Sequence, residues 1–255
     1  MDRLKGKNAI VTGARTGICR AIVKAFAEEG CNVWAVVHRD DEEFLGAMKE
    51  MEQQNGVWIK PVHINLEDEE DIKRGMREIT SEKLPIDILV NGAGVTSPSR
   101  LIAMTSMKDI HRVMQVNFFA AVQVSQVVAK SMLRQKRGSI INIASVAGID
   151  GDLSQLEYSA SKAALICATK KMAYEWGDFG IRANAIAPGL IETKMLGDME
   201  PAVVEELVRK TSLHRVGQPS EVAQLCVFLA SDESSYISSE TIRIDGGGYK
   251  FRFHL

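Results

Sequence analysis

The stretch NAIVTGARTGICRAIVKAFAEEG (residues 8–30) decides the fold, because glycines join a short apolar run to an amphipathic one. NAIVTG (8–13) is closed by glycine and predicts a buried strand. ICRAIVKAFAEEG (18–30) has apolar residues at helical spacing and ends on Gly30, which predicts a helix with a glycine stop. The turn TGARTGIC (12–19) lies between them. A glycine turn from strand to helix is where a helix N-terminus can bind phosphate.

The rest of the chain repeats this alternation. Strands are predicted at 32–37, 58–64, 86–94, 139–145, 182–188 and 241–245, and helices at 40–55, 67–82, 106–135, 157–178 and 219–231. Continuous apolar strands separated by helices imply a parallel sheet covered on both faces. The sequence shows neither a linker nor a repeat. It therefore predicts one α/β domain over residues 1–255, a doubly wound, Rossmann-like parallel sheet of about seven strands.

Composition narrows the classes of function. The chain has 255 residues, 45% hydrophobic and 25% charged, which is typical of a soluble globular protein. Its net charge of −2 predicts no nucleic-acid or membrane partner. It shows no run of about 18 apolar residues and no signal-peptide pattern, so we expect a cytoplasmic protein. Four scattered cysteines and five scattered histidines predict buried free thiols and no metal site.

The glycine turn suits a dinucleotide. Gly13 permits the tight turn, and Gly17 lets the backbone approach a pyrophosphate at the start of the following helix. Cys19 stands at the last glycine of the motif, a position that controls how closely helix and strand pack. Cysteine is small and apolar, which favours a retained site over a lost one. Alone, the motif is weak, because such turns also occur without a nucleotide.

A second constellation is more specific. Ser145 ends a predicted strand, and Tyr158 and Lys162 follow at helical i, i+4 spacing, so their side chains project from one face. An ammonium beside a phenol lowers the pKa of the phenol from about 10 toward neutrality. Such a phenol can exchange a proton with a carbonyl or an alcohol. Tyr158 and Lys162 alone also fit a surface helix pair; the strand-ending serine and the glycine turn favour catalysis.

With these motifs the chain resembles the short-chain dehydrogenase/reductases along nearly its whole length. The matching segments are TGARTGIC (12–19), NGAG (91–94), VNF around Asn117, Ser145, YSASK (158–162) and IAPGLIET (186–193). The C-terminal part, HRVGQPSEVAQLCVFLASDESSYISSETIRIDGGGY (214–249), is most similar to beta-ketoacyl-acyl-carrier-protein reductases of fatty acid biosynthesis. The resemblance implies a catalytic tetrad of Asn117, Ser145, Tyr158 and Lys162. It makes Tyr158 the acid, Ser145 the group that orients the carbonyl, Lys162 also a ligand of the nicotinamide ribose, and Asn117 the holder of a relay water.

The chain departs from the family pattern in the nucleotide half. Cys19 replaces the third glycine, and Gly92 replaces the second asparagine of the common NNAG, which either loosens a backbone clamp or is harmless. Asn65 stands where many members have aspartate beside the adenine; an amide can still donate and accept there.

The end of the second strand points to NADP(H). An acid there binds the ribose 2′-hydroxyl and repels a 2′-phosphate, but the sequence reads Val37-His38-Arg39. Arg39, together with Arg15, can pair with a phosphate, although surface arginines are often merely solvated. Asp40 and Asp41 come later and are expected to begin the next helix.

The predicted cofactor-binding set follows the carboxyl ends of the strands, where such sheets bind ligands. Within it, the proline-glycine loop after residue 187 resembles the family segment that holds the nicotinamide amide. The set comprises Gly13, Arg15, Thr16, Gly17, Ile18, His38, Arg39, Asn65, Leu66, Asn91, Ala93, Gly94, Tyr158, Lys162, Pro188, Gly189, Ile191 and Thr193.

These features predict an NADP-dependent short-chain oxidoreductase that transfers hydride from NADPH to a ketone. The family resemblance favours a 3-oxoacyl thioester on acyl carrier protein. A sugar, polyol, steroid or other small ketone is the alternative substrate. A non-catalytic dinucleotide-binding module is the alternative of another class, and the intact tetrad disfavours it. Enoyl reductases of this fold usually space tyrosine and lysine more widely than YSASK does.

Four further features have two interpretations each. Residues 195–215 either cover the substrate or form a surface helix pair. The alternating tail YKFRFHL (249–255) fits a subunit interface or a frayed terminus. The small residues of the helix at 157–178 suit packing in a homodimer or homotetramer, or packing within one chain. Arg134, Lys136 and Arg137 form a basic cluster that fits an acidic carrier protein or simple solvation.

Overall fold

The structure is a computed structural model that describes residues 2–151, 155–197 and 200–248. Seven parallel strands form one sheet in the order β3-β2-β1-β4-β5-β6-β7. Their bounds are β1 Asn8–Thr12, β2 Asn32–Val37, β3 Ile59–His63, β4 Ile88–Asn91, β5 Gly138–Ile143, β6 Ile181–Pro188 and β7 Thr241–Ile244. Ile10 of β1 pairs with Trp34 of β2 and Leu89 of β4. The strand order reverses between β1 and β4, so the prediction of a doubly wound, Rossmann-like sheet is confirmed.

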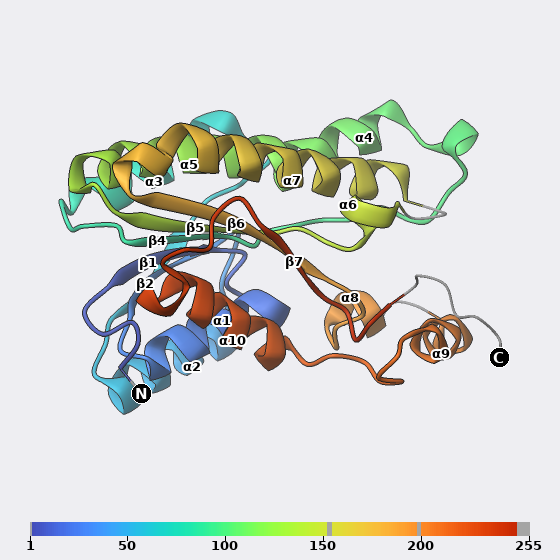
Figure 1. Ribbon diagram of the computed structural model, residues 1–255, viewed down its shortest axis with the longest axis horizontal. Helices are drawn as coiled ribbons and strands as arrows, with labels where there is room; N and C mark the ends of the chain where they lie inside the picture. Colours follow the sequence, from blue (N-terminus) through green and yellow to red (C-terminus); the bar gives the residue numbers. More distant parts are fainter. Residues whose placement is uncertain (1, 152–154, 198–199, 249–255) are drawn as a thin grey trace.

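Helices cover both faces of the sheet (Figure 1). On one face lie α1 (Gly17–Glu28), α2 (Glu42–Asn55) and α10 (Pro219–Ala230); on the other lie α3 (Glu69–Ser81), α4 (Met107–Met114), α5 (Ala120–Gln135) and α7 (Leu156–Trp176). Each interface buries its own apolar core, one around Phe26 and Phe44 and the other around Trp34 and Met132. Burial on both faces explains why the strands have continuous apolar sequences.

Shorter elements lie mostly near the carboxyl ends of the strands. They are α6 (Ala147–Asp150), α8 (Lys194–Gly197), α9 (Pro201–Lys210), the 3₁₀ turns η1 (Ile102–Met104), η3 (Gly177–Phe179) and η4 (Asp232–Ser234), and one π-helical turn, η2 (Gln115–Phe119). In Figure 1, α8 and α9 lie beyond the edge of the layered body, as does the turn that contains η1.

By length and composition alone, the continuous helical run Met107–Gln135 is long and apolar enough to cross a membrane. This finding qualifies the expectation that no such stretch exists. Half of its most apolar 18-residue window is buried inside the protein, and Val124, Val128 and Met132 pack in the core against the sheet. The run therefore has the character of a core helix.

Candidate active site

The glycine turn after β1 is packed between two other strand-end loops. Gly13 and Gly17 have φ angles of 75° and 58°, which favour glycine. A Cβ on Gly13 would lie 2.8 Å from the Cα of Ala93 after β4, and one on Gly17 would lie 3.4 Å from Cγ2 of Thr193 after β6. The turn thus gathers three predicted cofactor segments at the switch point.

Among the residues that the structure describes, none caps the N-terminus of α1 with its side chain. Its first flanking residue, Thr16, is extended and its hydroxyl accepts no capping hydrogen bond, whereas Asp41 caps α2 and Asp68 caps α3. The first turn of α1 also contains no acidic residue. Its open N–H groups and the positive end of its dipole therefore fit an anion such as a pyrophosphate. This feature supports a dinucleotide at the turn that contains Gly13 and Gly17.

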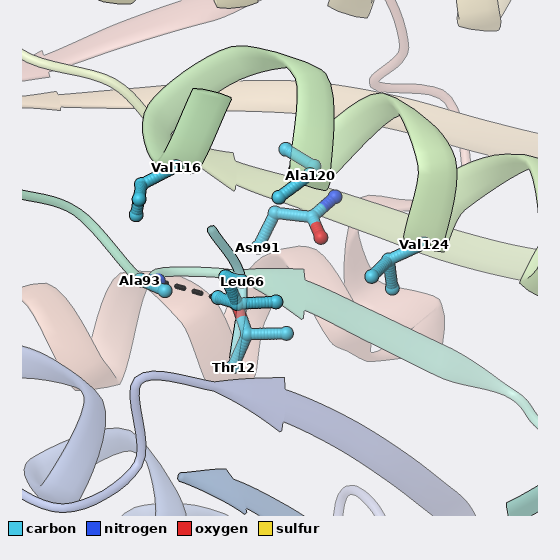
Figure 2. A pocket seen from close by; sticks show the side chains of 8 residues that line it. Thr12, Leu66, Asn91, Ala93, Val116, Ala120 and Val124 are labelled. Carbon is cyan, nitrogen blue, oxygen red and sulfur yellow. Dashed lines mark hydrogen bonds between the residues drawn. The ribbon is translucent and has the colours of Figure 1, made fainter. Parts of the chain in front are cut away.

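Thr12, at the end of β1, fixes the loop that follows β4. Its Oγ1 accepts a hydrogen bond from the backbone N–H of Gly92 at 3.0 Å and another from that of Ala93 at 3.2 Å, the second of which is drawn in Figure 2. The backbone at position 92 therefore has a clamp from a neighbouring strand although residue 92 has no side chain. We call residues 92–95 the β4 loop.

Asn117 lies in the π-helical turn and is 1% exposed. Its Nδ2 donates to the carbonyl of Val95 at 2.9 Å and to Oγ of Ser161 at 3.0 Å, and its Oδ1 accepts from the Val95 N–H at 2.8 Å. The side-chain amide therefore clamps both backbone groups of one residue in the β4 loop. A π-helical turn inside a longer helix is frequent at functional sites.

Lys162 is buried against the β4 loop and β5. It is 3% exposed, and its Nζ donates to the carbonyl of Ile143 at 2.8 Å. The same Nζ lies 5.7 Å from the centroid of the Tyr158 ring, and 3.3 Å from where a Cβ on Gly94 would be. Burial lowers the pKa of Lys162 from its usual 10.5 to about 8. No carboxylate of the described residues forms an ion pair with it, so its charge is available to the phenol and a ligand.

Ser145 follows β5 and is 9% exposed. Its Oγ accepts from the N–H of Ala147 at 3.1 Å, and the next residue, Val146, donates its N–H to the carbonyl of Pro188 at 3.0 Å. The short helix α6 then packs on α7, since a Cβ on Gly148 would meet the backbone of Lys162. These contacts hold the serine loop between the β6 loop and the helix that carries Tyr158.

The loop after β6 closes this side of the site. Gly189 packs against Asp245, which follows β7, and Ile191 forms a backbone bridge with Gly217. Thr193 contacts the glycine turn at Gly17. The segment predicted to hold the nicotinamide amide therefore lies next to the turn predicted to hold the phosphates.

The adenosine half is more exposed. His38 and Arg39 follow β2 at the surface, and Arg39 forms no ion pair with any residue that the structure describes. Arg15 is paired with Asp41, and Asp40 with His63. Asp41 caps α2 through the Phe44 N–H, as expected, but the helix begins at Glu42, two residues later than the predicted bound. Of the two arginines predicted to bind a 2′-phosphate, one therefore already has an acidic partner.

Two further predicted residues use their side chains elsewhere. Asn65 accepts at Oδ1 from the Glu67 N–H, while its own N–H donates to Asp71, so its amide stabilises a local turn. The side chain of Asn91 points toward α5 (Figure 2), and its Nδ2 donates to Ser125 at 2.9 Å and to Asn142 at 2.8 Å. Any contact of Asn91 with a cofactor would have to come from its backbone.

A small cavity of about 10 Å³ lies beside the Asn91 amide. It is lined by Thr12, Leu66, Asn91, Ala93, Val116, Ala120, Ala121 and Val124 (Figure 2). The Oδ1 of Asn91 is buried with no hydrogen-bond partner among the described residues. The volume is that of one water molecule, which would satisfy this acceptor.

The segment predicted to cover the substrate forms α8 and α9, apart from residues 198 and 199, which lie outside the described part. Val203 and Leu213 are 43% and 61% exposed. The predicted interface tail, residues 249–255, also lies outside the described residues.

Comparisons with known proteins identify the family of the chain. The family model described as "Enoyl-(Acyl carrier protein) reductase" matches residues 13–249. With this match and the relatives below, the chain belongs to the short-chain dehydrogenase/reductase family. It is an oxidoreductase of a family whose cofactor is a nicotinamide dinucleotide.

Curated relatives resemble the chain along its length. It is 40% identical over 246 residues to the 3-oxoacyl-[acyl-carrier-protein] reductase of Thermotoga maritima, covering 96% of this chain and 98% of the relative. It is 37% identical over 245 residues to the enzyme of that name from Aquifex aeolicus, covering 96% and 98%.

Solved structures give the same fold. A 3-oxoacyl-[acyl-carrier protein] reductase from Brucella melitensis superposes with a TM-score of 0.89 at 31% identity, covering 98% of this chain and 94% of that one. A candidate gluconate dehydrogenase from Agrobacterium tumefaciens superposes with a TM-score of 0.90 at 28% identity, covering 96% of both chains.

Proposed function

We propose that the protein is an NADPH-dependent carbonyl reductase whose substrate is a 3-oxoacyl thioester on acyl carrier protein. The observation that carries the proposed chemistry is Lys162, a buried ammonium beside the Tyr158 ring that forms no ion pair with a described residue. The substrate class follows from the names of relatives that are 37–40% identical over 96% of this chain.

Tyr158 is the proposed proton donor. The positive charge of Lys162 favours the phenolate, so the phenol gives up its proton to a ketone oxygen more readily than free tyrosine does. Ser145 is proposed to hold that same oxygen. Its hydroxyl accepts from Ala147 N–H, which leaves the hydroxyl proton to donate toward the substrate.

Asn117 is a proposed positioning residue. Both ends of its amide are hydrogen-bonded to Val95, so it fixes the loop against which Lys162 packs. The family resemblance assigns it a relay water as well. The side-chain oxygen of Asn117, Oδ1, can accept a second hydrogen bond without giving up the one from the Val95 N–H.

The proposed dinucleotide site fits the residues present. The amides of the glycine turn and of the uncapped α1 would hold the pyrophosphate, Lys162 the nicotinamide ribose, and the loop from Pro188 to Thr193 the carboxamide. When bound, the nicotinamide supplies the hydride. The preference for NADPH over NADH is proposed to rest on Arg39, the exposed cation after β2. Arg15 must release Asp41 before it can contribute.

A second substrate class has one observation in its favour. The candidate gluconate dehydrogenase has a TM-score of 0.90 with this chain, so a sugar acid or another small polyol is the alternative.

The proposed carrier protein would meet basic side chains. Arg134 and Lys136 are exposed, while Arg137 is paired with Asp87. A cytoplasmic homotetramer is the proposed working form.

The test is a turnover assay with NADPH against ketogluconate and against acetoacetyl thioesters, on acyl carrier protein and on a small thiol, with NADP+ in place of NADPH for the oxidation of gluconate. We expect the carrier-bound thioester to give the highest kcat/KM. Turnover of the sugar acids alone would mean that the substrate is a sugar acid and not a 3-oxoacyl thioester. NADPH binding without turnover of any ketone would support the binding module.

A further inference from the structure

Two of the departures from the family pattern, Cys19 and Gly92, touch each other in the structure. Cys19 is the third residue of α1, and Gly92 follows β4, 73 positions later. A Cβ built on Gly92 would overlap Sγ of Cys19. It would also lie 3.2 Å from the carbonyl oxygen of Thr12 and 3.5 Å from Cγ1 of Ile143. The space beside residue 92 is therefore filled by the Cys19 thiol and bounded by the ends of β1 and β5.

We propose that Cys19 and Gly92 form a matched pair that positions the β4 loop over the reaction site, with the thiol occupying the volume a side chain at position 92 would need. The cysteine supports the loop from α1, and the glycine makes room for it. Neither departure is then a lost element of the site, because each one compensates for the other.

The β4 loop connects this pair to the proposed catalytic groups. Gly92 and Ala93 are hydrogen-bonded to Thr12, and Val95 is clamped by Asn117. Between them, Gly94 lies against Lys162 Nζ and Asn117 Oδ1, at 3.3 and 3.5 Å from its would-be Cβ. Gly94 lies only two residues after Gly92. A shift of the loop at residue 92 must therefore change the surroundings of Lys162.

The thiol acts by its volume. Cys19 is 4% exposed, and burial raises the pKa of its thiol to about 12, so it stays neutral at physiological pH. Cys226 lies in the same apolar core, and every cysteine that the structure describes is a free thiol. A neutral sulfur in close packing is a spacer, and removing it leaves a gap under the loop.

A double-mutant cycle tests the pair. The variants are Cys19→Ala, Gly92→Ala and the double variant. The control is Gly46→Ala, since Gly46 is exposed on α2 and a Cβ there would contact no atom of the described residues. Alone, Gly92→Ala is expected to lower the melting temperature without cofactor by about 5 °C or more. In a protein that already carries Cys19→Ala, the Gly92→Ala substitution is expected to lower the melting temperature by less than half as much. Gly46→Ala should leave the melting temperature equal or raised.

Two further measurements separate positioning from stability; they rest on the proposed function. Gly92→Ala is expected to weaken NADPH binding about tenfold and to move the pH midpoint of turnover, and Cys19→Ala should restore both. A purely structural pair would move the melting temperature and leave the pH midpoint in place. If no variant binds NADPH, the proposed function fails while the cycle in melting temperature still stands.

Additive effects in the cycle would overturn the proposal, as would a Gly92→Ala variant as stable as the control. Should Gly92→Ala alone fail to fold, the double variant decides. Recovery of soluble, cooperatively melting protein on adding Cys19→Ala supports the pair, and continued failure contradicts it.

Discussion

The reaction half and the adenosine half of the site are built differently. Asn117 and Lys162 are buried, and the hydrogen bonds that hold them go to backbone groups or to Ser161. Arg39 is exposed and unpaired among the described residues, while Arg15 is held by a surface carboxylate. We propose that burial fixes the chemistry in one half and that screened surface charges select the cofactor in the other. Changes in the first half should therefore be large and insensitive to salt, and those in the second small and salt-dependent.

The largest effect is expected from Lys162→Met. This change removes the charge beside Tyr158 at nearly constant shape, so turnover should fall by about 10²- to 10⁴-fold. Stability should be kept or increased, because a buried charge with no ion-pair partner among the described residues is removed. Steady-state kinetics and thermal melting check both halves of the prediction; a variant that melts early and turns over normally would contradict it.

Asn117→Ala should have the next largest effect. It leaves the N–H and carbonyl of Val95 without their partner, which costs at most about 1–3 kcal/mol for each group, since Val95 is only partly buried. Turnover should fall by about tenfold to a hundredfold as the β4 loop loosens. The matched control is Ser161→Ala, which removes one acceptor of the same amide and leaves the Val95 clamp. Equal effects of the two changes would argue against the clamp.

The pH dependence of turnover should follow Lys162. Burial lowers its pKa to about 8, so the ammonium is present below that pH and is lost as the pH rises through it. Turnover should then fall by about tenfold per pH unit beyond the midpoint. The free energy of unfolding should instead rise between pH 8 and 10, because Lys162 in the unfolded chain keeps its proton up to a higher pH than in the folded protein. A pH profile that is flat from 7 to 10 would remove this role of Lys162.

Arg39→Ala examines the adenosine half. It should raise the KM for NADPH by about tenfold and leave the KM for NADH nearly unchanged, because only NADPH carries the 2′-phosphate. The difference should shrink at high salt. Equal changes for both cofactors would mean that Arg39 does not select between them.

Asp41→Asn should give the smallest effect. Asparagine still caps α2, so stability changes little, while Arg15 loses its partner and becomes available to a phosphate. The affinity for NADPH should rise about two- to threefold. Asp68→Asn, at the equivalent cap of α3, is the control and should leave cofactor affinity unchanged.

Much of the frame was predictable from the sequence because it depends on local patterns. The strand at 32–37 has the predicted bounds, and the glycine turn lies between β1 and α1 as expected. The predicted strand 86–94 was too long, since β4 ends at Asn91, before the glycines of the β4 loop. The π-helical turn was missed, since its residues, QVNFF, have no spacing that separates them from an α-helix.

Contacts between distant residues could not be predicted. The side chain of Asn91 turns to Ser125, and Arg15 pairs with Asp41; neither partner is indicated by periodicity. The contact of Cys19 with Gly92 joins two positions that the sequence presents as separate anomalies. This contact follows from the order of strands in the sheet, which places β4 next to β1.

The central claim is that a phenol, tuned by a buried ammonium, delivers the proton in ketone reduction. Tyr158→Phe tests it most directly, with NADPH binding followed by fluorescence and reduction of an acetoacetyl thioester followed by absorbance. We predict that binding stays within about threefold of the parent protein while turnover falls by at least about a hundredfold. Unchanged turnover with intact binding would contradict the claim.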